Sequence, residues 1–389
     1  MESFTFLSPT KFVFGVDTEN AVGELVASYG GSKVLIVYGG GSVVRSGLLD
    51  RVQKSLTASK ISFFSISGVQ PNPLDTKVYE GIQLCRKEGI DFLLPVGGGS
   101  VIDTAKAIGM GACYDGDFWD FYSGKAVAEK TLPLGTVLTI AAAGSEGSES
   151  SVITKSEGMY KRGCSNEIIR PLFSVLNPAL TATLPKEQTA AGAADIFAHI
   201  MERYFTNTKE VEVTDRLCEG LMLTLLHEVP RALVDPENVD VRANIMWAGM
   251  VAHNNIVGVG REQDWASHGL EHELSAKYSV AHGAGLAIIF PAWMKYTYEH
   301  DVMRFAQWAN RVFGIAMDFA NPKATALAGI HALENYFASC GLPVRMSEIG
   351  GKAEDIDYLV EHLQLNGGTM GSFVKLDANA CAEIYRISL

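Results

Sequence analysis

Two residues four positions apart in one predicted helix, Asp195 and His199, are the first candidates for chemistry. They lie in the stretch AGAADIFAHIMERYF, residues 191–205. Four residues make about one helical turn, so a carboxylate and an imidazole project from the same face. Such a pair supplies half of the ligands of a typical metal site. Taken alone, the pair also fits a solvated helix surface, because Asp-x-x-x-His is common by chance.

Three more histidines follow in a stretch rich in small residues. His268-Gly-Leu-Glu-His272 repeats the four-residue spacing, and His282 opens a further predicted helix. One aspartate with two or three histidines suits Fe²⁺ or Zn²⁺ with an open coordination position. The remaining histidines stand singly and are interpreted as structural or surface residues: His227, His253, His300, His331 and His362.

Two glycine-rich turns, at residues 39–42 and 97–100, each follow a short apolar run. Such turns let backbone N–H groups approach a phosphate, and the N-terminus of the next helix favours an anion. Neither turn matches the dinucleotide fingerprint, because a bulky residue stands where a third glycine or alanine is expected. A tight strand-to-helix turn is the alternative for each, but two such turns in one frame favour nucleotide binding.

Asp103 and Lys106 follow the second turn in the sequence GGGSVIDTAK. Their spacing alone fits two interpretations equally well: polar residues on a helix surface, or residues with a functional role. A third loop of small residues, 142–148, follows the predicted strand 134–141.

The elements that position these residues change in kind along the chain. Strands predicted at 33–38, 61–66, 91–96, 134–141, 151–154 and 173–176 alternate at first with helices at 48–56, 75–87 and 101–110. This alternation predicts a parallel sheet with helices on its faces, and residues 3–14 predict one or two further strands.

After residue 184 the predicted elements are all helices. Helical patterns cover 186–206, 211–234, 240–257, 262–277, 282–299, 301–315, 321–340, 352–362 and 377–386. We therefore predict an α/β domain at residues 1–184 and an all-helical domain at residues 185–389.

Composition excludes several classes of function. The formal net charge of −12 argues against nucleic-acid binding, which needs clustered Lys and Arg. No run of 18 apolar residues predicts a membrane span, and the N-terminus does not resemble a signal peptide. The six cysteines are scattered, which is typical of reduced thiols and predicts a cytoplasmic protein.

Taken together, several motifs carry a family resemblance. They are GGGSVIDTAK, the Pro-Asn-Pro at 71–73, the Ser-Glu at 145–146, LTATLP at 180–185, and the Asp and His pattern from 195 to 282. In this order they resemble the iron-containing (group III) alcohol dehydrogenases, most of all the NADPH-dependent butanol dehydrogenase and aldehyde reductase branch. The resemblance implies a dehydroquinate synthase-like architecture, with a Rossmann-like α/β domain and an all-α domain.

The resemblance also implies a role for individual residues. Metal ligation falls to Asp195, His199, His268 and His282, and His272 is expected beside the metal as a proton relay. Cofactor contacts fall to Asn72, Gly97, Gly98, Gly99, Ser100, Thr139, Ala142, Ser148, Lys161 and Leu180. From the sequence itself we also predict cofactor contacts at Gly39, Gly40, Gly41, Ser42 and Asp103. The expected partners are a small alcohol or aldehyde and a second copy of the chain in a homodimer, with the substrate between the two domains.

Three departures from the family pattern affect the cofactor. Ala143 replaces a threonine in the usual GTGSE loop, and Asn177 replaces the aspartate of Asp-Pro. NAD-preferring relatives place an Asp after the first strand to bind the ribose hydroxyls, whereas Gly39 stands here. Without that carboxylate, and with Ser42 and Arg45 nearby, a 2′-phosphate is tolerated, so we predict NADP(H).

The substrate and the identity of the metal remain open. Aromatic and apolar residues favour short- to medium-chain aldehydes if they line the pocket, although each also fits a core position: Trp119, Phe121, Tyr122, Met250, Trp265 and Phe290. The alternatives are a Zn-dependent polyol dehydrogenase of the glycerol type, a dehydroquinate synthase-type lyase and a non-catalytic nucleotide-binding protein. The lyase needs clustered basic residues near 195–282, which the sequence lacks.

Overall fold

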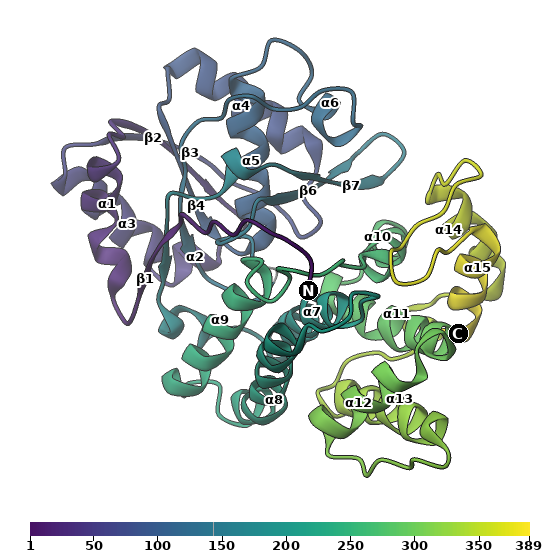
Figure 1. Cartoon of the computed structure of the whole chain (residues 1–389). Coiled ribbons are helices and arrows are strands. Elements are labelled where there is room, and N and C mark those ends of the chain that lie inside the picture. The colour runs from purple at the N-terminus through teal and green to yellow at the C-terminus, as the bar shows by residue number, and fades with distance from the viewer. Residues whose placement is uncertain (143) are drawn as a thin grey trace. The chain divides into compact units, whose positions relative to one another are not determined.

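The structure, a computed structural model, describes residues 1–142 and 144–389. They form two compact units (Figure 1). An α/β unit contains residues 7–183 and 237–246, and a helical unit contains residues 1–6, 184–236 and 247–389.

Two short segments depart from the predicted domains 1–184 and 185–389. The amino group of Met1 donates to the carbonyl of Lys209, and the N–H of Glu2 donates to that of Gly260, so the N-terminus joins the helical unit. Met246 packs with Ile102, which draws residues 237–246 into the α/β unit.

Six parallel strands build the sheet of the α/β unit in the described part of the chain, in the order β1-β8-β5-β4-β2-β3. They are β1 (Lys11–Phe14), β2 (Lys33–Tyr38), β3 (Ser62–Ile66), β4 (Phe92–Gly97), β5 (Gly135–Leu138) and β8 (Phe173–Leu176). An antiparallel hairpin of β6 (Ser150–Lys155) and β7 (Tyr160–Ser165) stands apart from this sheet.

Helices cover both faces of the sheet (Figure 1). Along β2, Val34 and Ile36 face α1 (Val22–Ser28) and α3 (Leu48–Ala58), while Leu35 and Val37 face α4 (Asp75–Glu88) and α5 (Gly99–Ala112). This alternation is the period of two that a strand buried on both faces requires. The predicted Rossmann-like fold class is confirmed.

The strands differ from the prediction at two places. Residues 3–10 are not in a strand, so the predicted β region 3–14 shrinks to β1. Strand β7 was not predicted, because YKRGCS has no apolar run and its pairing with β6 is a tertiary property.

The helical unit contains the predicted series of helices. They are α7 (Lys186–Tyr204), α8 (Glu212–Val234), α9 (Val239–His253, whose first part lies in the other unit), α10 (Ala266–Tyr278), α11 (His282–Thr297), α12 (Val302–Phe313), α13 (Pro322–Ser339), α14 (Ile356–His362) and α15 (Ala378–Ile387). Helix α7 is buried from Thr189 to Tyr204 and packs against α8 and α11.

A close backbone approach fixes where α11 meets α7. A Cβ atom placed on Gly283 would lie 1.8 Å from the carbonyl oxygen of Ala191, so only glycine fits at this position. The small residues 190–194 of α7 therefore serve packing within the helical unit. This contact sets His282, the first residue of α11, beside the turn of α7 that carries Asp195.

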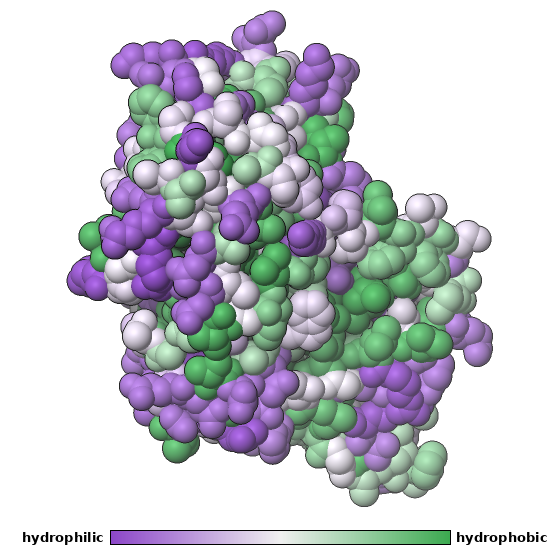
Figure 2. Space-filling view, turned by 90° about the vertical axis from the view of Figure 1, so that its left-hand side faces the viewer, coloured by the Kyte–Doolittle hydropathy of each residue, from purple (hydrophilic) through white to green (hydrophobic). Residues whose placement is uncertain are grey.

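None of the helices in the described residues is both long enough and apolar enough to cross a membrane. Hydrophilic and apolar residues are interspersed over much of the face drawn in Figure 2, as expected for a chain with 20% charged residues.

A candidate metal centre and a nucleotide site

Helix α7 carries the first part of the candidate site on one buried face. Asp195 and His199 are one turn apart, and their residues are only 3% and 4% exposed. Burial excludes the interpretation of this pair as decoration of a solvated helix. Glu202 follows on the next turn and is 1% exposed.

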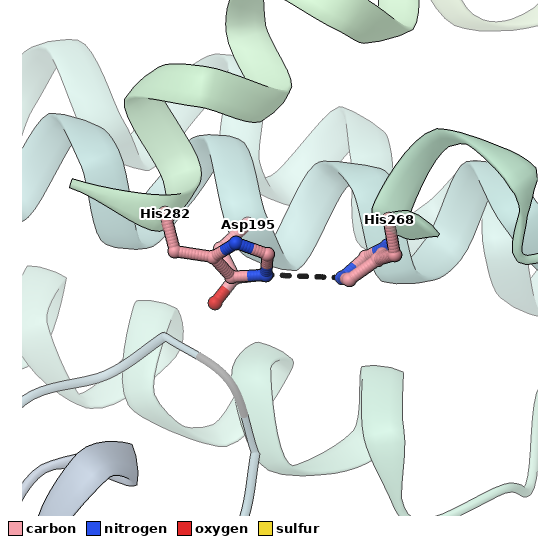
Figure 3. Close-up of side chains that lie close together, drawn as sticks. All are labelled: Asp195, His268 and His282. Carbon is pink, nitrogen blue, oxygen red and sulfur yellow. Dashed lines mark ion pairs between the residues drawn. The ribbon is translucent and has the colours of Figure 1, made fainter. Parts of the chain in front are cut away.

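Three imidazoles converge on one carboxylate oxygen. The Oδ1 atom of Asp195 lies at the following distances from Nε2 atoms: His199 3.5 Å, His268 3.7 Å and His282 3.8 Å. Figure 3 shows Asp195, His268 and His282, which come from three different helices and lie close together. Asp195 Oδ1 and His268 Nε2 are buried and have no hydrogen-bond partner among the described residues.

Carboxylates on the outer side of the cluster orient two of the rings. Nδ1 of His268 lies 2.5 Å from Oε2 of Glu202, whose other oxygen accepts the N–H of His268. Nδ1 of His282 contacts Oε2 of Glu271, which is fully buried. A carboxylate at Nδ1 turns Nε2 inward, an arrangement typical of metal-binding histidines.

The pKa shifts show that the cluster attracts positive charge. Burial would lower the pKa of His268, but Glu202 and Asp195 outweigh it and raise this pKa to about 9. Burial, followed by the neighbouring imidazoles, holds the pKa of His199 well below its usual value. Burial also raises the pKa of Glu202. A cluster whose carboxylates draw a proton onto His268 would also favour a bound cation.

These residues fit a divalent metal. Ligand atoms held about 2.0–2.1 Å from a tetrahedral ion lie roughly 3.3 Å from one another. The three Asp195 distances are slightly longer than this, and among the described residues Asp195 Oδ1 and His268 Nε2 have no hydrogen-bond partner that would satisfy them without an ion. Oxygen and imidazole nitrogen together suit Fe²⁺ and Zn²⁺.

His199 and His272 occupy different places around this cluster. Ligand atoms of Asp195, His268 and His282 all lie within 4.8 Å of one another, and His199 joins them through Asp195. The His272 ring lies 5.6 Å from that of His282 and belongs with Glu271 to a neighbouring group. His272 is thus beside the candidate ligands, where a relay is expected.

The glycine turns of the α/β unit lie at adjacent strand ends. Tyr38 pairs with Val96, so the turns at 39–42 and 97–100 leave the sheet side by side. Thr139, which follows β5, donates its N–H to the carbonyl of Gly97. Because β2 and β4 are neighbours whose connections run in opposite directions, this edge is the topological switch point where α/β sheets bind nucleotides.

The other predicted cofactor residues lie in the same unit. Asn72 follows β3, Ala142 follows β5, Leu180 follows β8, Ser148 precedes β6, and Lys161 is a buried residue of β7. Ala143 lies outside the described residues. The predicted cofactor residues thus belong to the α/β unit, and the predicted metal ligands belong to the helical unit.

Lys106 is fully buried and Asp103 is half-buried, so their interpretation as helix-surface polarity is wrong. Nζ of Lys106 donates to the carbonyls of Ser145, Ser148 and Ser150 at 2.7–2.8 Å. The Asp103 carboxylate accepts from Oγ of Ser145 at 2.6 Å and from the N–H of Val152 at 3.0 Å. These bonds hold the segment that leads into β6. Any contact of Asp103 with a cofactor stays a prediction.

Comparison with known families decides the identity of the chain. Residues 9–178 match the model of the iron-containing alcohol dehydrogenases, and residues 189–389 match the C-terminal model of the same family. The chain belongs to the iron-containing alcohol dehydrogenase family. It is therefore an oxidoreductase of the alcohol dehydrogenase type, and the predicted family resemblance is confirmed.

Individual members of this family are similar over the full chain. The probable NADH-dependent butanol dehydrogenase 1 of Bacillus subtilis (strain 168) is 40% identical, with all of both chains covered. The NADPH-dependent aldehyde reductase YqhD of Escherichia coli (strain K12) is 36% identical over 95% of each chain. The crystal structure of an NADH-dependent butanol dehydrogenase A from Thermotoga maritima superposes with a TM-score of 0.97 at 40% identity, covering 100% of this chain and 99% of that one.

Family membership implies a divalent metal and a nicotinamide cofactor. The two glutamates that contact the candidate ligands were not predicted, although helical spacing places each on the same helix face as a candidate histidine. Glu202 follows His199 by three residues, and Glu271 follows His268 by three. His253 carried no such signal, yet its ring stacks on that of His199 at 4.0 Å.

Most of the aromatic candidates for a substrate pocket are core residues. Phe121 and Tyr122 pack in the core of the α/β unit, and Phe290 is fully buried against Phe205 and Trp293. Trp265 differs, because its ring meets those of His199 and His268 edge-on at 6.0 and 5.4 Å and is 37% exposed.

Proposed function

We propose that this family member is a metal-dependent, NADP(H)-linked alcohol dehydrogenase that interconverts short- to medium-chain aldehydes and alcohols. The observation that carries the proposal is the set of three imidazole nitrogens 3.5–3.8 Å from one buried carboxylate oxygen that has no hydrogen-bond partner among the described residues. Asp195, His199, His268 and His282 would hold the metal, either Fe²⁺ or Zn²⁺.

The bound metal would supply Lewis acidity that polarises the aldehyde oxygen, worth several kcal/mol, and the reduced nicotinamide would supply the hydride. The protein's own residues hold and orient these groups. Glu202 and Glu271 keep two imidazoles turned inward. His272, beside His282, would pass the proton between the alcohol and solvent.

The cofactor preference rests on the turn after β2. Gly39 offers no carboxylate to repel a 2′-phosphate. Arg45 is exposed, and its guanidinium folds back over the turn, with Nη1 2.7 Å from where a Cβ on Gly41 would lie. A cation here favours a phosphate. The names of relatives include both NADH- and NADPH-dependent enzymes, so the preference is open to a direct test.

For the substrate, we infer a small apolar aldehyde or alcohol rather than a polyol, because Trp265 presents an aromatic surface beside the candidate ligands.

The free cysteines suit a reducing compartment, so we place the enzyme in the cytoplasm. Strand β1 is an edge of the sheet with an exposed Phe14, which supports a homodimer. We also propose that the two domains meet near residue 184 of the sequence, and that the fifteen predicted cofactor residues contact NADP(H).

An anaerobic assay of NADPH oxidation with butanal tests the proposal. The metal-free protein is reconstituted with Fe²⁺ or Zn²⁺ in separate samples. We expect activity with at least one ion and a kcat/KM for NADPH above that for NADH. Inactivity with both ions would refute the metal-dependent reaction. A ratio below one would refute only the NADP(H) preference. Oxidation of glycerol with NADP⁺, assayed in parallel, separates an aldehyde reductase from a polyol dehydrogenase.

A further inference from the structure

Of the three histidines around Asp195, His199 is oriented in a different way. His268 and His282 each have a carboxylate at Nδ1. Nδ1 of His199 is buried and has no hydrogen-bond partner among the residues that the structure describes. A metal-binding imidazole needs an outer contact that fixes its orientation, so another kind of contact must hold this ring.

Ring stacking supplies that contact. The His199 ring is nearly parallel to the His253 ring, with centroids 4.0 Å apart and 14° between the planes. It also stacks on His268 at 4.8 Å and 12°, but His268 is itself a candidate ligand. His253, at the end of α9, therefore provides the closest ring contact from outside the ligand set.

Arg203 in turn fixes His253. Its guanidinium lies 3.2 Å from Nδ1 of His253 and donates to the backbone carbonyl of His199 at 2.8 Å. It also lies over the ring of Trp265 at 4.7 Å. A guanidinium only donates, so Nδ1 of His253 accepts and the proton of its neutral ring is on Nε2. Arg203 is 3% exposed and ties the stacked ring to the backbone of the ligand helix.

We propose that His253 is a positioning residue for the metal ligand His199. Its ring face, fixed by Arg203, takes the place that Glu202 and Glu271 take for the other two histidines. The inference rests on the metal site of the proposed function. Removing the ring lets the His199 imidazole turn away from Asp195, which weakens metal binding. Losing an outer contact of a metal ligand lowers metal affinity about 10- to 100-fold, and we expect a loss of this size.

Titration of the metal-free, full-length protein with Co²⁺ alone tests the inference, because visible absorption reports the ligand set independently of activity. Competition with a chelator gives the affinity. We expect His253→Ala to bind Co²⁺ about 10- to 100-fold more weakly than the wild type, with altered absorption bands. His253→Phe keeps a ring face and should recover most of the affinity. His253→Asn keeps an acceptor for Arg203 but has no ring, and should resemble His253→Ala.

His362→Ala is the matched control. That histidine also stacks on an aromatic ring, Tyr358 at 4.8 Å, and its Nδ1 also contacts a charged group, Glu273 at 2.9 Å. Neither partner is a candidate ligand, so Co²⁺ affinity should stay at the wild-type value.

Unchanged affinity and spectrum in His253→Ala would overturn the inference. Should that variant fail to fold, the other two decide. Tighter Co²⁺ binding by His253→Phe than by His253→Asn supports it, and equal or weaker binding overturns it. A wild-type protein that binds no Co²⁺ would instead overturn the metal site itself, so the two failures are distinguishable.

Discussion

Each of the two units contains a group of charged side chains that is shielded from water. The two groups differ in whether the protein itself supplies their hydrogen-bond partners. In the α/β unit, Nζ of fully buried Lys106 donates to three backbone carbonyls, and Asp103 accepts from two donors. In the helical unit, Asp195 Oδ1 and His268 Nε2 are equally hidden from water but have no hydrogen-bond partner among the described residues.

This difference separates a structural network from a binding site. A buried polar atom without a partner costs about 1–3 kcal/mol, so such atoms persist where a ligand compensates for them. The Lys106 network needs no ligand, and we assign it to the stability of the segment that leads into β6. The Asp195 cluster needs a cation. Substitutions in the two groups should therefore affect different observables.

The largest effect is expected for His268→Ala in the helical unit. Loss of a ligand removes the metal and its Lewis acidity, so kcat/KM for butanal with NADPH should fall about a thousand-fold or more. Kinetics and metal analysis of the same sample measure both losses. His331→Ala, an exposed histidine of α13, is the control and should retain both. Wild-type activity in His268→Ala would contradict the assignment.

Lys106→Met should act on stability instead. Removing one member of a buried charged network costs about 3–5 kcal/mol of unfolding free energy, because three carbonyls lose their donor and the Asp103 carboxylate loses a nearby positive charge. Denaturant titration measures the change. Lys54→Met, at an exposed site on α3, should change stability by about 0.5 kcal/mol or less. Equal stability of Lys106→Met and Lys54→Met would contradict the structural role that we assign to the network.

A smaller change is expected for Glu202→Gln. The variant keeps the shape of the side chain but removes the charge that orients His268, so divalent metal affinity should fall about 10- to 100-fold. Chelator competition measures this change. Glu219→Gln replaces another buried glutamate of the helical unit, whose partners include Tyr204 and Arg216, and should leave metal affinity unchanged. Equal metal affinities of the two variants would contradict the role of Glu202 in orienting His268.

The smallest effect, counted per pH unit, is a pH dependence of the stability that the Lys106 network contributes. Burial lowers the pKa of Lys106 to about 8. The unfolded chain therefore holds more protons than the native chain between this value and the ordinary lysine pKa near 10.4, and stability from this group rises with pH in that window. The stability gap between the wild type and Lys106→Met should widen there, by at most about 1.4 kcal/mol per pH unit. A gap that narrows would contradict the lowered pKa.

Much of the fold was predictable because its elements have simple periods. The apolar runs before Gly39 and Gly97 indicated buried parallel strands, and the helices after residue 184 followed from the 3.6-residue spacing. Strand β7 was not predictable, because its polar sequence is a strand only through pairing with β6.

The candidate site was predictable only in part. The four-residue spacings of Asp195 with His199 and of His268 with His272 pointed to the ligand helices. The stack of His253 on His199 joins two helices, and no spacing within either one reports it. Burial of Lys106 and of Phe121 is likewise a tertiary property. Sequence patterns therefore indicated the chemistry of the ligands, but not the residues that hold them in place.

The most direct test of the central claim, that Asp195, His199, His268 and His282 bind a catalytic metal, is a stoichiometric titration. Metal-free wild-type protein is titrated anaerobically with Fe²⁺, or with Zn²⁺ if only that ion restores activity, while NADPH-dependent reduction of butanal is followed. Activity should be absent at the start and should rise to a plateau at about one ion per chain, as expected for a single three- or four-ligand site. Full activity before any metal is added would contradict the claim.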